Sequence, residues 1–269
     1  MKTDMTPPTI EFNESSTELI TGASPWTSPG KSNYQDQLLK PEFAAKRYKF
    51  PVGTTWFRIV PALCGSSRGW MLGIHALNYA SGRHAHPKTI KPGTKSVFDH
   101  AYGWCKDNIK ESLYSKMNKE GFRLLADPIC LFWMIVEENG QLNARLLMAS
   151  GYDGSRGGTP GLGHQIWKMT KEVDEDGNLI GNPAHPTLGA QICVEKRQTP
   201  GTRYPSYSLR LGRVAAPINE MLAKMDPEEV STLIPLEQVV HLPSVEDEWK
   251  LLENVIDADT VSKIRKSLG

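Results

Sequence analysis

The segment CLFWMIVEENGQLNARLLMAS (130–150) constrains the fold of this chain more than any other segment. Its Asn139-Gly140 pair supplies the positive φ angles of a two-residue hairpin turn, and β-prone apolar runs flank the pair. The first run is apolar at every position from Ile129 to Val136, which predicts a strand buried on both faces. We therefore expect a β-hairpin whose first strand lies at the centre of a sheet.

Four other segments have the composition of short strands bounded by Gly, Pro or polar residues. In TWFRIVPAL (55–63), Phe57 and Ile59 alternate with the side chains of the opposite face, as expected of a half-exposed strand. The other three predicted strands are WMLGIHALNYA (70–80), GAQICVEKRQ (189–198) and RYPSYSLRLG (203–212).

Helical patterns occur between these strands and after them. One helical region is predicted over 99–126, where apolar residues recur at four-residue spacing. A second, short helix is expected to be capped by Thr159 and opened by Pro160. Near the C-terminus, Ser244 and Asp247 are spaced as an acidic variant of the capping box that begins a helix. The helices thus collect in an insert and at the C-terminal end.

This order of elements predicts a mainly β fold with inserted and C-terminal helices (α+β), and the strands fit an OB-fold-like five-stranded barrel. The low apolar content of residues 1–44 predicts a flexible N-terminal segment. The barrel core is expected over 45–213, with a helical insert near 99–126. Residues 214–269 form an acidic helical C-terminal extension in this prediction.

Composition and cysteine spacing exclude a membrane protein and a disulfide-rich scaffold. Of the 269 residues 39% are hydrophobic, but no run of about 18 apolar residues could span a bilayer. The N-terminal sequence lacks the apolar centre of a secretion signal, so we expect a cytoplasmic protein. Cys130 and Cys193 lie in apolar runs, which is typical of reduced cysteines in a core.

The net charge of +1 conceals an uneven distribution of charged residues. Residues 40–123 carry many more basic than acidic side chains, whereas 1–39 and 214–269 are acidic. Two basic segments contain no acidic residue: the loop SGRHAHPKTIKPGTK (81–95) and the hairpin sequence KRQTPGTRYPSYSLRLG (196–212). Such clusters indicate a surface that binds a polyanion.

Aromatic residues recur beside basic residues in several segments. A nucleic-acid single strand exposes its phosphates and the faces of its bases, so binding needs cations for the backbone and rings for stacking. Trp133 is assigned to the core instead, with Trp56 as a second candidate for burial. The residues predicted to hold phosphates are Arg58, Arg83, Lys88, Lys91, Lys95, Lys196, Arg197, Arg203 and Arg210, and those predicted to stack on bases are Tyr79, Tyr102, Trp104, Tyr204 and Tyr207.

Motifs of nucleotide hydrolysis and of metal-dependent proteolysis are absent from the sequence. It contains neither the GxxxxGK[ST] phosphate loop nor an HExxH helix. The glycines between 151 and 163 predict a flexible loop that carries Arg156. We therefore expect a protein that is not an enzyme.

Candidate metal ligands fall within one stretch (75–105) but do not form a familiar zinc pattern. A closed zinc site needs four well-placed ligands, usually with a CxxC pair, and the chain has no CxxC. His84-Ala85-His86 is interpreted as polar decoration of the basic loop, and no cofactor is expected. The candidate ligands are His75, His84, His86, His100 and Cys105.

The order of these parts resembles that of the single-stranded DNA-binding (helix-destabilising) proteins of tailed bacteriophages. The likeness covers about 45–213 and rests on the strand WFRIVPAL, the basic loop after the next strand, the helical insert after FDHAYGWC and the late hairpin. In that family a glycine followed by Thr-Arg-Tyr enters the final strand of the barrel. The matching residues here are Gly201, Thr202, Arg203 and Tyr204.

The resemblance implies an OB-fold core that coats and protects single-stranded DNA in phage replication, recombination and repair, largely independently of sequence. It also implies a location in the cytoplasm of a bacterial host. Some members of the family hold zinc through a His and three Cys, but only His100 and Cys105 lie near that place here. The resemblance therefore adds no zinc site to the prediction.

The C-terminal part departs from the family, because it ends in amphipathic helix patterns rather than in an acidic tail. These helices are expected to bind either a neighbouring copy of the chain along the strand or a replication protein. The alternative function from another class is a phage structural or interaction protein with a basic DNA-contacting band. An enzyme acting on nucleic acid is a third hypothesis, and it would show metal-dependent turnover.

Overall fold

The computed structural model describes residues 37–79, 82–109, 124–155, 158–171, 182–198, 200, 205–253 and 255–268. Its centre is a mostly antiparallel 7-stranded sheet with the order β3-β2-β4-β1-β6-β7, in which β5 pairs with β4. The strands are β1 (Gly53–Ile59), β2 (Leu72–Tyr79), β3 (Gly82–Ala85), β4 (Asp127–Glu138), β5 (Gln141–Ser150), β6 (Ala190–Arg197) and β7 (Ser206–Ala215).

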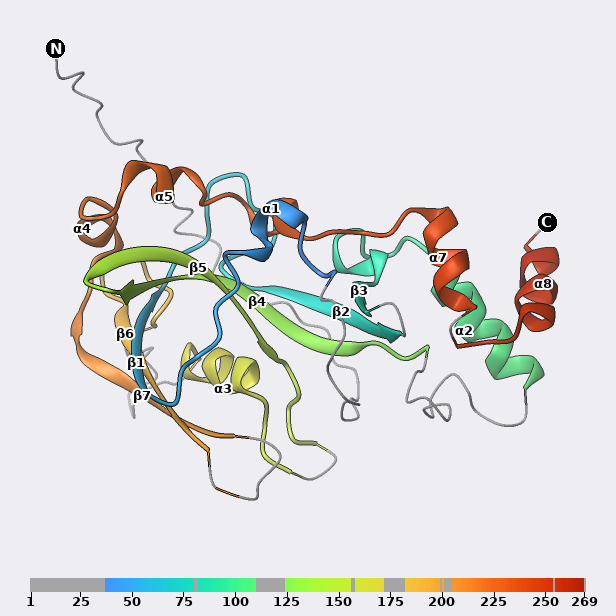
Figure 1. Ribbon diagram of the computed structural model, residues 1–269, viewed down its shortest axis with the longest axis horizontal. Coiled ribbons are helices and arrows are strands. Elements are labelled where there is room, and N and C mark those ends of the chain that lie inside the picture. Colours follow the sequence, from blue (N-terminus) through green and yellow to red (C-terminus); the bar gives the residue numbers. More distant parts are fainter. Residues whose placement is uncertain are drawn as a thin grey trace, which may run out of the picture.

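Helices lie on both sides of this sheet. Figure 1 shows α1, α4 and α5 above the β4–β5 pair and α3 on the opposite side. No helix in the described part of the chain is long and apolar enough to cross a membrane. The helices are α1 (Pro41–Ala44), the 3-10 helix η1 (Pro87–Thr89), α2 (Val97–Asn108), α3 (Leu162–Met169), α4 (Ile218–Leu222), α5 (Pro227–Ser231), α6 (Leu236–Val239), α7 (Val245–Leu252) and α8 (Ala258–Ser267).

The β4–β5 hairpin has the predicted turn and the predicted burial. Asn139 and Gly140 adopt φ angles of 53° and 78°, which a two-residue hairpin turn requires. Every residue from Ile129 to Val136 is buried, and Trp133 is only 2% exposed. One edge of β4 pairs with β5, while its other edge pairs first with β2 and then with β1. The strand is therefore central, as expected.

The sheet is not closed into a barrel. β1 pairs with β4 and β6, β4 pairs with β5, and β6 pairs with β7. Among the described residues no ladder joins β5 to β7, so this row of five strands stays open between them. The other two strands, β2 and β3, form an additional hairpin on β4. The mixture of an antiparallel sheet with helices is confirmed, whereas the predicted five-stranded barrel is not closed in the described part of the chain.

The two faces of the sheet have separate cores. On the inner face, Phe57, Phe132 and Ile192 pack with α3. On the outer face, Trp133 and Leu146 pack with the residues of α4, α5 and α6. Because side chains alternate along a strand, β4 contributes to both cores, which explains its continuous apolar sequence.

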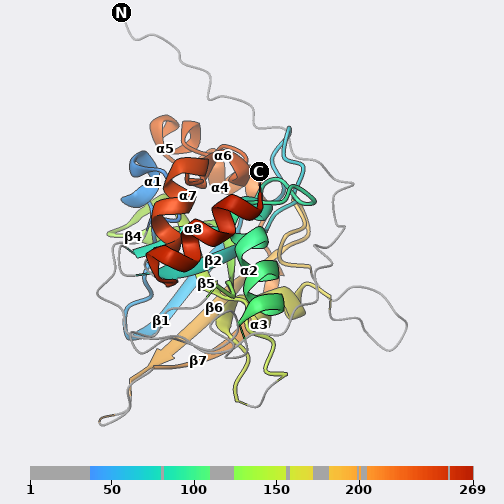
Figure 2. The same cartoon turned by 90° about the vertical axis from the view of Figure 1, so that its right-hand side faces the viewer.

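The C-terminal residues pack on the rest of the fold along their whole described length. α4, α5 and α6 cover the outer face of β4 and β5, and α7 and α8 pack against α2 in a third core. Figure 2 shows α2 beside α7 and α8. The buried carboxylate of Glu248 on α7 accepts a hydrogen bond of 2.8 Å from the backbone N–H of Val97, the first residue of α2. Burial raises the pKa of this carboxyl group.

Element boundaries differ from the predictions at three places. Leu38 and Leu39 are buried, so the segment predicted to be flexible (1–44) is ordered from 37 onward in the described residues. α2 ends at Asn108, and 110–123 lies outside the described residues. α3 begins at Leu162 after the N-cap Gly161, not after Thr159. The capping prediction for α7 is confirmed, since Ser244 accepts a hydrogen bond from the N–H of Asp247 at 3.2 Å.

Two histidines of the predicted basic loop are buried. His84 lies in β3, and His86 caps η1 by accepting a hydrogen bond from the N–H of Lys88 at 3.1 Å. The other ring nitrogen of His86 lies 3.3 Å from Ser96 Oγ and 3.4 Å from a carboxylate oxygen of Asp99. The interpretation of these histidines as surface decoration was wrong, because both are buried and His86 contacts the start of α2.

The half-buried imidazole of His75 on β2 should make the protein less stable in mild acid. Burial lowers the pKa of His75 to about 4, and Lys88 and His86 lower it further while Asp99 opposes them. The unfolded chain, with a His pKa of about 6.5, therefore takes up this proton first. The free energy of unfolding should fall as the pH falls from about 6.5 to about 4. Urea unfolding of the wild type and His75→Gln at several pH values measures this, and an equally steep fall in the variant would contradict it.

Candidate nucleic-acid interface

Part of the outer face of β1, β6 and β7, around Trp56 and Arg210, is exposed to solvent, in contrast to the outer face of β4 and β5. The strand register places Trp56 opposite Cys193 and Cys193 opposite Arg210. Trp56 is 41% exposed, and the guanidinium carbon of Arg210 lies 5.5 Å from the centroid of its ring. This is a cation–π pair, and its ring and its charge both remain accessible.

Trp56 was expected in the core, and that expectation was wrong. Phe57 occupies the inner face of β1, so the alternation of side chains turns Trp56 outward. Gly212 on β7 leaves room for the ring, because a Cβ atom there would lie 3.5 Å from Trp56 Cζ3 and 3.1 Å from the carbonyl oxygen of Gln191. The indole therefore lies close to the backbone of β7.

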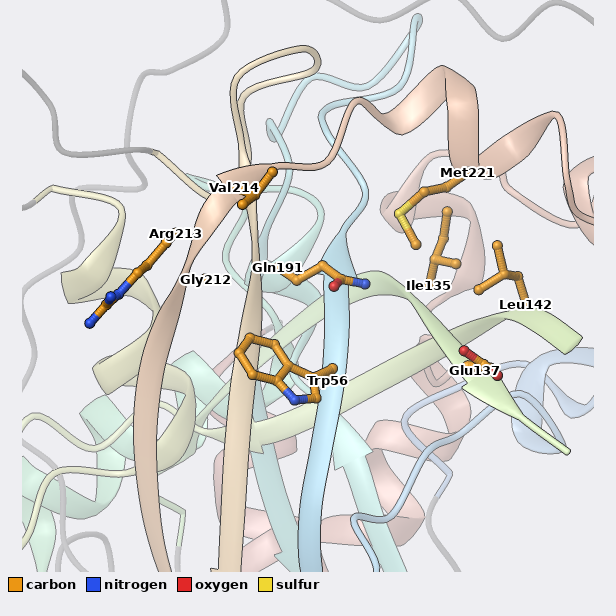
Figure 3. A pocket seen from close by; sticks show the side chains of 9 residues that line it. All are labelled: Trp56, Ile135, Glu137, Leu142, Gln191, Gly212, Arg213, Val214 and Met221. Atoms are coloured by element: carbon orange, nitrogen blue, oxygen red, sulfur yellow. The ribbon is translucent and has the colours of Figure 1, made fainter. Parts of the chain in front are cut away.

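A pocket with a volume of about 440 Å³ opens beside the Trp56 ring. Its polar side chains include Gln191 on β6, which Figure 3 shows above the ring, and Glu137 at the end of β4, on the other side of β1. Arg213 on β7 also lines the pocket, and Figure 3 shows its side chain extending away from the Trp56 ring. The apolar part of the lining is Ile135, Leu142, Val214 and Met221, and Gly212 on β7 completes it.

Arg58 closes the outer face beyond this pocket and is fully buried. It donates hydrogen bonds to the carbonyl oxygens of Ala216 and Ile59, each at 2.9 Å, and to those of Pro183 and His185. Burial lowers its pKa to about 10. Arg58 was predicted to hold phosphate, and this prediction was wrong because its donors bind the backbone of the 182–189 loop and of the segment after β7.

The β6–β7 hairpin carries the other predicted cations near this face. Arg197 is exposed and lies 2.8 Å from a carboxylate oxygen of Glu195, which offsets its charge. Lys196 donates a hydrogen bond of 2.7 Å to the carbonyl oxygen of Phe50. Arg203 and Tyr204 lie outside the described residues.

Side chains alternate between the two faces of the sheet along β7. Leu209 and Leu211 pack against the inner core, and Arg210 lies on the opposite, outer face. Tyr207 also turns inward, is half-buried, and has its ring centroid 6.5 Å from that of Phe50. Among the described cations of this hairpin, Arg210 thus has the most accessible position over an aromatic ring.

The basic loop lies at the other end of the molecule. Figure 1 shows β3 and α2 toward the right, far from β7 at the left. Lys91 and Lys95 are exposed there, whereas Lys88 and Arg83 are half-buried. The structure therefore does not bring these four cations to the Trp56 face.

The aromatic residues predicted for stacking at that end are partly or wholly buried. Tyr79 has no exposed surface, and its ring lies 6.1 Å from that of Phe98, so its prediction as a stacking residue was wrong. Burial raises the pKa of its hydroxyl group. Tyr102 and Trp104 on α2 are half-buried against the third core.

A metal centre finds no support among the described residues, where no group of three His, Cys, Asp or Glu side chains could hold an ion. His84, His86 and Cys105 are buried in packed regions, and all four cysteines are free thiols. Cys130 and Cys193 are buried, as predicted.

Comparisons with known proteins identify no family for this chain. No protein-family model matches it, and no curated protein is significantly similar to it in sequence. What the outer face binds must therefore be inferred from its residues. The residues that sequence reasoning missed there are Trp56, Glu137, Gln191 and Arg213.

Proposed function

We propose that this protein binds single-stranded DNA without chemical turnover. The observation that carries the proposal is the exposed Trp56 ring, with Arg210 over it and a pocket of about 440 Å³ beside it. Aromatic rings stack on unpaired bases, and arginines beside them hold phosphates or extend the stack. A duplex hides its base faces, so this surface suits a single strand better.

The strand arrangement also supports the proposal. The row β5-β4-β1-β6-β7 has the order of a partly open OB-type barrel, with the gap between β5 and β7. α3 lies between β5 and β6 in the chain and packs on the inner core. In such folds the loops between strands flank the nucleic acid. On this proposal the β6–β7 connection, with Arg203 and Tyr204, is one such loop.

The proposed role is to coat and protect exposed strands during replication and recombination, as in the phage proteins that the sequence resembles. The strand would run along β7, from Arg213 past Trp56 and Arg210 toward Arg197. Lys91 and Lys95 are then too distant to hold the same few nucleotides, and would contact only a longer strand.

Binding to oligo-dT and to a duplex of equal length, titrated at several salt concentrations, tests the proposal. We expect tighter binding to the single strand, and a steep weakening with salt because phosphate contacts release counterions. Equal affinity for both ligands would favour a structural DNA-contacting protein instead. No binding to either ligand would contradict both functions.

Arg210→Ala should reduce the salt dependence as well as the affinity. Loss of one phosphate contact lowers the slope of log K against log salt by about 0.7 for a single strand. Arg265→Ala is the matched control, because Arg265 lies 4.7 Å from the ring centroid of Trp249 at the far end of the molecule. Equal slopes for Arg210→Ala and the wild type would show that Arg210 does not contact a phosphate.

A further inference from the structure

The pocket beside Trp56 contains a carboxylate, Glu137, that contacts with DNA phosphates do not explain. Glu137 lines it, although a carboxylate repels the phosphates of a strand held by Arg210 and Arg213. Gln191 lines the same pocket. These two polar groups are therefore better suited to contact a nucleotide base than the phosphates of the DNA strand.

Trp56 and Glu137 line the same pocket. The β1–β4 ladder ends at the pair of Phe57 and Val136, and Trp56 and Glu137 are the next residues along the two strands. A base stacked on the indole can therefore turn its edge toward this carboxylate.

The size and the lining of the pocket are sufficient for one base and its sugar. A volume of about 440 Å³ lies near the lower end of the ~300–1,000 Å³ typical of small-molecule pockets. Apolar side chains of Ile135, Leu142 and Met221 form the wall opposite Gln191 (Figure 3). The wall can therefore cover the face and the sugar of a single nucleotide.

The chemistry of the two polar groups distinguishes between bases. An ionised carboxylate only accepts hydrogen bonds, so it requires an N–H donor on the base edge. Cytosine and adenine present exocyclic amino groups, whereas the N3–H donor of an unpaired thymine lies between two carbonyl oxygens that repel a carboxylate. The amide of Gln191 both donates and accepts, so it fits either kind of base.

We infer that this pocket holds one unpaired base and prefers a base with an exocyclic amino group over thymine. The inference rests on the proposed single-strand binding and adds a base preference to it. The acceptor is Glu137, the stacking surface is Trp56, and the charges that hold the adjoining phosphates are Arg210 and Arg213.

Competition between oligo-dC and oligo-dT of equal length tests the preference. The wild type should bind oligo-dC about fivefold more tightly, which is the scale of a single base-edge contact. In Glu137→Gln the side chain can also donate to thymine, so the ratio of the two affinities should fall toward one. Glu246→Gln on α7 removes the same charge from an exposed position outside the pocket, and it should leave the ratio unchanged.

The outcomes separate this inference from the proposed function. If the wild type binds both oligonucleotides equally tightly and better than duplex, the base preference is overturned while single-strand binding stands. If Glu137→Gln keeps the wild-type ratio, the preference does not arise at this pocket. If neither oligonucleotide binds better than duplex, the proposed function fails and the inference fails with it.

Discussion

Replacing Trp56 with alanine should weaken binding to single-stranded oligonucleotides by about tenfold to a hundredfold, because stacking contributes roughly 1–3 kcal/mol per base. The ring is 41% exposed and lies on the outer face, so its loss removes little of the packed interior. Trp56→Phe keeps a smaller stacking surface and should have an intermediate effect. Fluorescence anisotropy of a labelled oligonucleotide measures the three affinities.

The matched control is Trp104→Ala, because Trp104 is the tryptophan that sequence patterns predicted to stack and it lies on α2 at the far end. We expect its affinity to stay within about twofold of the wild type, as for residues outside a contact surface. Loss of binding in Trp104→Ala but not in Trp56→Ala would place the strand on α2 instead. Urea unfolding of both variants checks that each one is folded.

Replacing Arg58 with alanine should destabilise the protein by about 3–5 kcal/mol, since it leaves buried carbonyl oxygens without donors. Those oxygens belong to Ile59, Pro183, His185 and Ala216, so the change would release the 182–189 loop and the segment after β7 together. Equilibrium unfolding in urea measures the loss.

Gly189→Ala provides an independent check on the same packing. A Cβ atom at Gly189 would overlap the Arg58 guanidinium group and the carbonyl oxygen of His185, so we expect destabilisation here too.

Arg58→Met keeps much of the side-chain volume but removes all the donors, and should lose nearly as much stability as Arg58→Ala. A loss below about 1 kcal/mol in both Arg58 variants would show that these hydrogen bonds contribute little.

Local signals predicted the elements whose formation depends on a few neighbouring residues. The Asn139-Gly140 turn and the doubly buried strand before it require only turn chemistry and a continuous apolar run. The cap at Ser244 is likewise local. The openness of the sheet could not be predicted in this way, because it depends on whether β5 and β7, which are distant in sequence, form a ladder.

The candidate site was harder to predict because charge and aromaticity do not reveal exposure. Arg58 looked like a surface cation, but carbonyl groups more than a hundred residues away satisfy its donors. Tyr79 is likewise covered by α2 residues such as Phe98. The alternation of Phe57 and Ile59 did contain the signal for Trp56, since it implies that Trp56 faces outward.

Photocrosslinking tests most directly whether a single strand lies on the Trp56 face. After ultraviolet irradiation with a mixed-sequence oligonucleotide and digestion with trypsin, the adducts can be assigned to peptides by mass. We predict adducts on FPVGTTWFR (50–58), which contains Trp56, and on YPSYSLR (204–210) from the hairpin. Adducts confined to SVFDHAYGWCK (96–106), with none on the first two peptides, would contradict the proposed interface.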